Sequence, residues 1–357
     1  MSVENKFLPR ISIVTPSFNQ GEFLEECIDS VLGQNYPNLE YVIMDGGSTD
    51  NSVEIIKKYE KYLAYWQSKP DGGQYAAIND GFSKTTGEIM AWLNSDDKYH
   101  DRSFYVVACL FATQQHAEWV TGRPTFWDKN GDLAEIYDYL PTYCRSDFLD
   151  KKYNDPFIQQ ESTFWRRALW ERAGGRVRAD LGYAGDLELW VRFFRLTELY
   201  TIDALLSGYR GHGNQKAALS MDRYVEEAEK VLAEESDLVN GEAKPRMQPA
   251  PEPITISPRS MNVYFRNACP SPNRLQCSSY QVSQYMQRQL SDARAIINSS
   301  LPSDPAIDHG IHSCGMEQQI FTEQLRRCEA SLAAIESSRF WRLTKPLRIV
   351  ADWVRSL

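Results

Sequence analysis

The chain runs Ile89-Met90-Ala91-Trp92-Leu93-Asn94-Ser95-Asp96-Asp97, an apolar segment that ends in two adjacent carboxylates. The apolar residues predict a buried strand, and two acidic groups crowded at its end are costly unless a cation or a proton compensates their charge. At the carboxyl end of a strand in an open α/β sheet, the usual compensation is a hydrated Mg²⁺ or Mn²⁺ that also holds a phosphate. This stretch therefore predicts an α/β enzyme that acts on a phosphorylated donor.

The order of strand, polar loop and helix is repeated along the chain before this stretch. Strands are predicted at 11–15, 39–44 and 64–67, and helices over 22–32, 53–59 and 75–84. The loops after the strands carry turn glycines and helix-capping residues. This repetition is typical of a parallel, doubly wound sheet, so the polar loops are expected to meet at one edge of it.

The alternation is less regular after residue 101. A helix is expected over 104–115, short strands within 119–143, a helical stretch over 162–173 and a strongly amphipathic helix over 187–196. Trp190 is expected in the core, because helical spacing points it in the same direction as Leu187 and Phe194.

Composition excludes several classes of protein. The net charge of −9 argues against a general nucleic-acid binder, which is normally basic. The seven cysteines are odd in number and form no CxxC pattern, so a reduced, cytoplasmic setting is favoured over a disulfide framework. The first ten residues lack the apolar segment of a signal peptide, and no run of about 18 apolar residues could span a membrane.

The length of 357 residues suggests more than one structural part. We expect a catalytic domain over 1–216, a region with a helix and a Pro- and Ser-rich linker over 217–313, and a C-terminal helical extension over 314–357. The extension begins with a short heptad seam and ends in a basic, amphipathic tail helix.

Five short motifs follow one another between residues 10 and 215: Thr15-Pro16-Ser17-Phe18-Asn19, Asp45-Gly46-Gly47-Ser48-Thr49-Asp50, Asp71-Gly72-Gly73-Gln74, Asn94-Ser95-Asp96-Asp97 and Asp186-Leu187-Glu188-Leu189-Trp190. In this order and spacing they resemble glycosyltransferase family 2, the inverting enzymes with the GT-A fold. The resemblance implies a doubly wound, mostly parallel sheet with helices on both faces. It also implies a nucleotide-sugar donor and a divalent cofactor, Mg²⁺ or Mn²⁺.

The resemblance assigns donor binding to residues of the first four motifs. The first motif would cradle the nucleotide, Asp45 would read the base through the imide N–H of uracil, and Asp71 and Gln74 would close over the donor. The full set of expected donor-binding residues is Thr15, Pro16, Ser17, Asn19, Asp45, Gly46, Asp71, Gln74, Asn94, Ser95 and Asp96. Asn94 stands where the family more commonly has an acid.

The resemblance also assigns the metal and the chemistry. Asp97 is expected to coordinate the metal directly, Asp96 to lie towards ribose or sugar hydroxyls while also serving as a candidate ligand, and His212 to approach the metal or the diphosphate. The metal would stabilise the departing diphosphate. Asp186 matches the catalytic base, with Glu188 as its nearest rival, although Gly185 stands where many relatives have an acid.

Residues Gln159 and Glu161 are interpreted as part of an acceptor-side segment. The expected reaction moves a sugar, most simply from a UDP-sugar, to a hydroxyl of a glycan or a lipid-linked acceptor in polysaccharide or O-antigen (lipopolysaccharide) biosynthesis. The tail over 337–357 resembles tails of bacterial polysaccharide-assembly proteins. Its basic and apolar residues suit peripheral contact with the cytoplasmic face of the inner membrane, or a partner protein.

Two other functions stay open. A sugar-nucleotide nucleotidyltransferase also uses a doubly wound sheet with acidic metal ligands, but it normally carries a basic, glycine-rich loop after the first strand, and residues 15–21 contain no basic side chain. A non-catalytic scaffold of a polysaccharide-assembly complex is the other alternative, which the intact acidic motifs disfavour. A dinucleotide-binding dehydrogenase is excluded because no GxGxxG follows the first strand.

Overall fold

The computed structural model describes residues 8–137, 140–146, 158–213, 215–240 and 250–254. These residues all belong to one compact unit, which spans 1–271. The predicted heptad seam, the tail over 337–357 and most of the predicted linker lie outside the described residues. In the described part of the chain, no helix is long and apolar enough to cross a membrane.

Four parallel strands form the first half of the main sheet, in the order β4-β1-β2-β3. They are β1 (Ile11–Ser17), β2 (Leu39–Asp45), β3 (Tyr65–Ser68) and β4 (Ile89–Trp92). Ser17 of β1 pairs in register with Asp45 of β2, which pairs in turn with Ser68 of β3. Because the strands end in register, the loops after them meet at one edge, as the sequence predicts.

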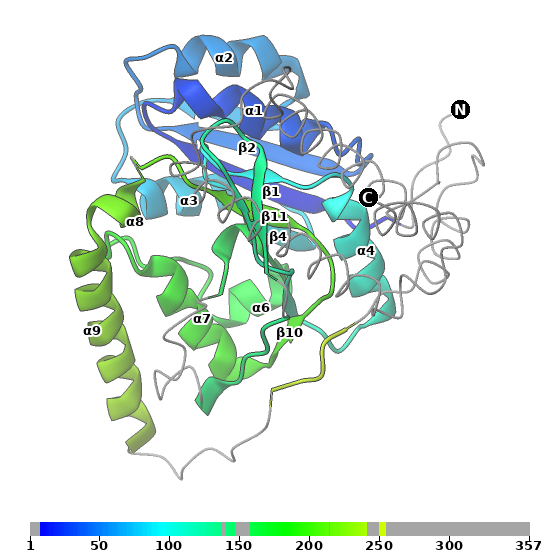
Figure 1. Cartoon of the computed structure of the whole chain (residues 1–357), viewed down its shortest axis with the longest axis vertical. Helices are drawn as coiled ribbons and strands as arrows, with labels where there is room; N and C mark the ends of the chain where they lie inside the picture. The colour runs from blue at the N-terminus through cyan, green and yellow to red at the C-terminus, as the bar shows by residue number, and fades with distance from the viewer. Residues whose placement is uncertain (1–7, 138–139, 147–157, 214, 241–249, 255–357) are drawn as a thin grey trace, which may run out of the picture. The chain divides into compact units, whose positions relative to one another are not determined.

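Helices cover both faces of these strands. They are α1 (Gly21–Leu32), α2 (Ser52–Tyr59), which continues into a short 3₁₀ turn (Glu60–Tyr62), and α3 (Gln74–Phe82). The chain moves outward from β1 to β3 and then returns to β4, so right-handed crossovers place α3 on the face opposite α1 and α2 (Figure 1). The contact of α3 with β1 needs Gly81, since a Cβ there would lie 2.5 Å from Cγ1 of Val14.

The second half of the main sheet inserts an antiparallel strand. The full order is β10-β6-β9-β4-β1-β2-β3, in which β6 (Trp119–Thr121) and β10 (Leu199–Thr201) are parallel to each other. Strand β9 (Thr163–Arg166) is antiparallel to both β4 and β6. The helix predicted over 162–173 is therefore wrong in its first half, and α6 begins only at Arg167 (Arg167–Arg172). The β-branched and aromatic side chains of β9 fit a buried central strand better than a helix.

A smaller sheet of four strands lies beside the end of β4. It has the order β5-β11-β7-β8 and consists of β5 (Lys98–Tyr99), β7 (Thr125–Trp127), β8 (Leu133–Ile136) and β11 (Ser207–Arg210). Strand β5 directly follows Asp97, and β11 pairs with it. This pairing brings residues near 210 next to the acidic motif.

The remaining helices are α4 (Ser103–Thr113), α7 (Gly185–Leu196), α8 (Lys216–Leu219) and α9 (Met221–Asn240). A short 3₁₀ turn (Gln160–Ser162) precedes β9. Trp190 of α7 is 2% exposed and stacks on Trp92 of β4, with ring centroids 6.0 Å apart. The predicted core position of Trp190 is confirmed, and this contact joins α7 to the strand that leads into the acidic motif.

Candidate functional site

The loops that carry the predicted motifs are hydrogen-bonded to one another. The backbone N–H of Asn19 donates to Oγ of Ser48 at 2.7 Å, and the N–H of Thr49 donates to Oδ1 of Asn19 at 2.8 Å. Across the edge, Nε2 of Gln74 donates to Oδ1 of Asn94 at 2.8 Å. The structure thus brings together four motifs that are far apart in the sequence.

Several of the predicted donor-binding residues lie beneath this edge rather than on it. Thr15 is fully buried, and its Oγ1 lies 3.1 Å from the hydroxyl of Tyr41. Pro16 is also buried, as is Ser95 in the acidic motif. Ser17 is 5% exposed, and among the described residues its Oγ has no hydrogen-bond partner. Thr15 and Pro16 therefore support the edge from within β1.

Asp45 organises its own loop. Its Oδ2 accepts hydrogen bonds from the N–H groups of Gly47 and Ser48, at 3.1 and 2.9 Å, and from Oγ of Ser68 at 2.6 Å. Its Oδ1 accepts from Oγ of Ser48 at 2.5 Å, and the residue is only 1% exposed. Asp45 therefore stabilises the turn over residues 45–48 rather than a helix N-terminus, and its role in reading a base stays a prediction.

Gly46 leaves a space that Asp71 and Phe18 border. A Cβ at Gly46 would lie 3.2 Å from Oδ2 of Asp71 and 3.3 Å from Cδ2 of Phe18. Asp71 is exposed and accepts a hydrogen bond from the N–H of Gly73, while Phe18 is 60% exposed. An exposed carboxylate beside an exposed ring can bind a nucleobase by a hydrogen bond and by stacking.

The side chain of Asn94 links three parts of the site. Its Oδ1 accepts from Gln74, and its Nδ2 donates to Oδ2 of Asp97 at 3.2 Å and to Oε1 of Gln160 at 3.4 Å. An ionised aspartate at position 94 could not donate either of the last two hydrogen bonds. The amide therefore explains why this chain departs from the family's acidic residue.

Asp97 is directed into the protein. It is 1% exposed, its Oδ1 accepts from the backbone N–H of Arg210 at 2.8 Å, and its Oδ2 accepts from Asn94. Burial, and then the negative charges of Asp96 and Glu161, raise its pKa well above the ordinary range of a carboxyl group. Both oxygens of the residue that we expect to coordinate metal thus already accept hydrogen bonds from the protein.

Asp96 is the more exposed aspartate of the motif, and it contacts His212, whose side chain is 4% exposed. Nε2 of His212 lies 3.1 Å from Oδ2 of Asp96, whose side chain is 16% exposed. The imidazole packs on the ring of Phe23, with centroids 4.4 Å apart, and Nε of Arg210 donates to the carbonyl oxygen of Asp96 at 2.6 Å. In the part of the chain that the structure describes, no group of three His, Cys, Asp or Glu side chains forms a complete metal site.

Asp186 lies in the first turn of α7. Its Oδ1 accepts from the N–H of Leu187 at 2.8 Å, and burial raises its pKa to about 6. The residue before it must be small, because a Cβ at Gly185 would lie 2.6 Å from the ring of Tyr75. Packing against Tyr75 thus explains why no acid precedes Asp186.

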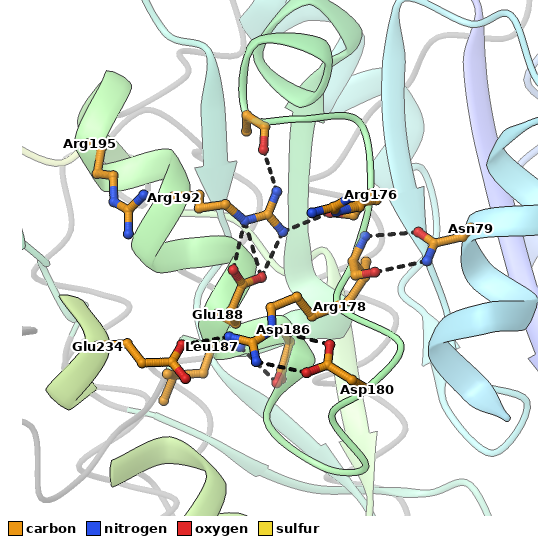
Figure 2. Close-up of polar contacts among 12 residues, drawn as sticks. Asn79, Arg176, Arg178, Asp180, Asp186, Leu187, Glu188, Arg192, Arg195 and Glu234 are labelled. Atoms are coloured by element: carbon orange, nitrogen blue, oxygen red, sulfur yellow. Dashed lines mark hydrogen bonds and ion pairs between the residues drawn. The ribbon is translucent and has the colours of Figure 1, made fainter. Parts of the chain in front are cut away.

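Glu188, the rival to Asp186, is held in an ion pair. Nε and Nη2 of Arg192 donate to its two carboxylate oxygens at 2.9 and 2.7 Å, and Nη2 also donates to the carbonyl oxygen of Arg176 (Figure 2). The residue is 8% exposed. Through Arg192, Glu188 therefore connects α7 to the segment that precedes it.

Glu161 is a buried carboxyl group between the acidic motif and α7. It is 4% exposed, and its Oε1 has no hydrogen-bond partner among the described residues. Burial, together with the negative charges of Asp186 and Asp96, raises its pKa to about 8. Sequence reasoning named Glu161 only as part of an acceptor-side segment. It did not identify Arg210, because a single arginine outside the acidic motifs forms no recognisable pattern.

Comparison with known sequences gives consistent matches. The family model described as glycosyl transferase family 2 matches residues 12–172. An uncharacterized glycosyltransferase of Mycobacterium tuberculosis is 30% identical over 202 residues, which are 56% of this chain and 74% of that protein. A Bacillus subtilis glycosyltransferase, provisionally named for teichuronic acid biosynthesis, is 34% identical over 96 residues, 26% of this chain and 37% of its own length.

Among solved structures, a fragment of Staphylococcus aureus TarS in complex with UDP-GlcNAc is similar to this chain, with a TM-score of 0.52 and 16% sequence identity. The match covers 80% of this chain and 81% of the TarS fragment. A longer TarS chain is matched over 49% of its length, with a TM-score of 0.50 at 15% identity. At such identity the likeness concerns the fold, and it confirms the predicted GT-A architecture. The acidic edge, the parallel sheet and the matched relatives together show that the chain belongs to glycosyltransferase family 2.

Proposed function

We propose that this glycosyltransferase moves a sugar from a nucleoside-diphosphate donor, most simply UDP-linked, to a hydroxyl of a glycan or lipid-linked acceptor. The observation that supports this most directly is the placement of two acidic groups around β4. Asp96, paired with His212, follows β4, and Asp186 lies in the first turn of α7, which stacks on β4 through Trp92 and Trp190. This arrangement offers one place for a diphosphate and another for a base. The UDP-GlcNAc in TarS supports the choice of donor.

At the base end of the donor, we assign the hydrogen-bonding carboxylate to Asp71 rather than Asp45. The oxygens of Asp45 are occupied within its loop, whereas Asp71 is exposed beside Gly46 and Phe18. A carboxylate accepts a hydrogen bond from the imide N–H of uracil, and the ring of Phe18 offers a stacking face. Asn19 and Gln74 line the same edge of the sheet.

The residues present fit a divalent cation. Mg²⁺ and Mn²⁺ sites in such enzymes use one or two protein ligands together with substrate phosphates and water, and Asp96 with His212 supplies one carboxylate and one imidazole. Bound there, the ion would neutralise charge on the departing diphosphate. Asp97, Asn94 and Arg210 would fix the loop that presents Asp96.

Asp186 is the proposed general base. Its pKa of about 6 keeps it ionised at neutral pH, yet basic enough to accept the proton of an acceptor hydroxyl as that oxygen attacks the anomeric carbon. The hydroxyl attacks from the side opposite the leaving diphosphate, which accounts for inversion. Glu188 cannot take this role while both its oxygens are bonded to Arg192.

For the acceptor, we propose a growing cell-surface polysaccharide. The teichuronic acid relative supports this class of product. Synthesis of O-antigen or lipopolysaccharide, and peripheral attachment to the cytoplasmic face of the inner membrane through residues 337–357, are proposals that rest on the sequence of the tail.

The test is hydrolysis of a panel of UDP-, GDP- and TDP-sugars by the purified protein with Mn²⁺, Mg²⁺ or EDTA. We expect slow, metal-dependent turnover of a UDP-sugar that Asp186→Asn abolishes. Calorimetric titration with UDP on the same samples gives a second readout that needs no acceptor. If the protein neither hydrolyses any donor nor binds UDP, the scaffold alternative is favoured instead. Release of pyrophosphate from a nucleoside triphosphate and a sugar phosphate would favour a nucleotidyltransferase.

A further inference from the structure

Helix α9 binds the loop that leads into Asp186. The carboxylate of Glu227 accepts hydrogen bonds from three consecutive backbone N–H groups, those of Gly182, Tyr183 and Ala184, at 2.7, 2.7 and 2.9 Å. Burial raises the pKa of Glu227, but these hydrogen bonds outweigh it and hold the pKa below its ordinary value. An ionised carboxylate therefore holds this loop through charge-assisted hydrogen bonds, which are stronger than neutral ones.

The same loop is fixed from its other side. The hydroxyl of Tyr75 donates to the carbonyl oxygen of Tyr183 at 2.7 Å, and Nζ of Lys216 donates to that of Gly182 at 2.6 Å. The ring of Tyr75 also fills the space at Gly185. The N–H groups point to Glu227 while the carbonyl groups point to other elements, so the loop has a single defined path into α7.

Helix α9 also lies close enough to Asp186 for an electrostatic interaction. Tyr224 is one turn before Glu227, and burial together with the charge of Asp186 raises its pKa. Figure 1 shows α9 running along the outer side of α7, and the two helices are in contact. Packing of α9 along α7 thus places Tyr224 within electrostatic range of Asp186.

We propose that Glu227 is a positioning residue for catalysis: it holds residues 182–184 so that Asp186 faces the acceptor hydroxyl. This inference rests on the proposed role of Asp186. A displacement of about 1 Å at a reacting group can cost on the order of a hundredfold in rate. Tyr75 and Lys216 bind only carbonyl groups of the loop, and no side chain of the loop caps α7, so Glu227 is the side chain that holds its N–H groups.

The test compares Glu227→Gln, Glu227→Asp and Glu226→Gln in the full chain. Gln has the size of Glu but leaves one neutral oxygen for three donors, Asp keeps the charge on a shorter side chain, and Glu226 is an exposed neighbour of equal charge on α9. Hydrolysis is followed with the sugar nucleotide that wild type turns over fastest in the panel, in Mn²⁺, across pH 5 to 9. UDP affinity is measured by calorimetry, and hydrogen exchange is measured at residues 182–187 and in β1.

We expect Glu227→Gln to lower kcat about ten- to a hundredfold with unchanged KM and UDP affinity, and to shift the acidic limb of the pH profile. In Glu227→Gln, hydrogen exchange should be faster than in wild type at residues 182–187 and unchanged in β1. Glu227→Asp should recover part of the rate, and Glu226→Gln should behave as wild type. Unchanged exchange, or faster exchange with unchanged kcat, would overturn the inference. An active Asp186→Asn protein would instead overturn the proposed base, which separates the two failures.

Discussion

Nε2 of His212 lies 3.1 Å from Oδ2 of Asp96, although the two residues are 116 positions apart in the sequence. The contact exists because β11 pairs with β5, the strand that directly follows the acidic motif. It brings an imidazole, a candidate metal ligand under the proposed function, next to the carboxylates of the acidic motif. The first prediction tests which carboxylate faces the metal.

Asp96→Ala and Asp97→Asn should differ in their effect on metal binding. Asp96→Ala removes the accessible partner of His212 and should abolish Mn²⁺-dependent hydrolysis. Asp97→Asn keeps an oxygen that can accept from the N–H of Arg210, so it should keep measurable Mn²⁺ affinity with UDP bound. Titration of Mn²⁺ followed by electron paramagnetic resonance measures both. Loss of the ion only in Asp97→Asn would restore Asp97 as the direct ligand.

The pH dependence of kcat should report Asp186. Because burial raises its pKa to about 6, the base is protonated and inactive below that pH, and activity should rise with pH and level off above about 7. Asp186→Asn should reduce kcat on the order of a hundred- to ten-thousandfold while leaving UDP affinity intact. A flat profile from pH 5 to 8 would contradict the assignment.

Asn94→Asp, which introduces the acid common in the family, should impair this protein. The substitution removes the donor to Gln160 and puts a second carboxylate against the buried Asp97. Leaving buried groups unsatisfied costs about 1 to 3 kcal/mol, so the free energy of unfolding should fall by that amount. Urea unfolding measures it, with the exposed substitution Asn130→Asp as control. Equal stability of Asn94→Asp and wild type would show that the amide is not required.

Because of Glu161, we expect the free energy of unfolding to fall as the pH becomes alkaline. Its pKa rises from the ordinary 4.5 to about 8, so the folded protein keeps a proton that the unfolded chain releases. The stability that protonated Glu161 contributes is complete below pH 4.5 and is lost as pH rises through 8. Glu161→Gln should therefore be more stable than wild type at pH 8, with a smaller difference at pH 5. Urea unfolding in EDTA at both values checks this.

The assignment of the nucleobase site predicts a selective loss of UDP affinity. Asp71→Asn and Phe18→Ala should each weaken UDP binding in calorimetry, because one loses a charged acceptor and the other a stacking face. Asp71→Asn should lessen the preference for UDP over GDP. Conversely, Asp45→Asn should lower the melting temperature, since its oxygens organise a loop. If Asp45→Asn instead weakened UDP binding without lowering the melting temperature, Asp45 rather than Asp71 would be the residue that binds the base.

Much of the fold is predictable because the first strands are local patterns. Runs such as Ile11–Ser17 are β-branched and end in turn residues, so each strand and the loop after it can be identified without tertiary information. The order of the motifs along a parallel sheet then places them at one edge. The core position of Trp190 follows from such a local pattern and is confirmed. The family and the GT-A fold follow from the resemblance of the five motifs to glycosyltransferase family 2, and both are confirmed.

The rest depends on contacts between distant parts of the chain. The helix expected over 162–173 fails at β9 because pairing with β4 and β6, rather than local periodicity, decides its conformation. Similarly, no local pattern shows which of Asp96 and Asp97 is buried, since Asp97 is held by Arg210 at the end of β11 and Asp96 by His212, two residues beyond that strand. Glu227 lies on an ordinary amphipathic helix, and only the folded chain shows that it binds the loop before α7.

The central position of β9 has a consequence for synthesis of the chain. Until residues 163–166 leave the ribosome, β4 has a neighbour on only one side, and the unpaired N–H and C=O groups of this apolar strand are open to pairing with other chains. A nascent chain therefore carries an aggregation-prone edge over more than seventy residues of translation, from Trp92 to Thr163. Truncation before β9 should give insoluble protein, so the shortest fragment worth expressing must include that strand and its partner β6.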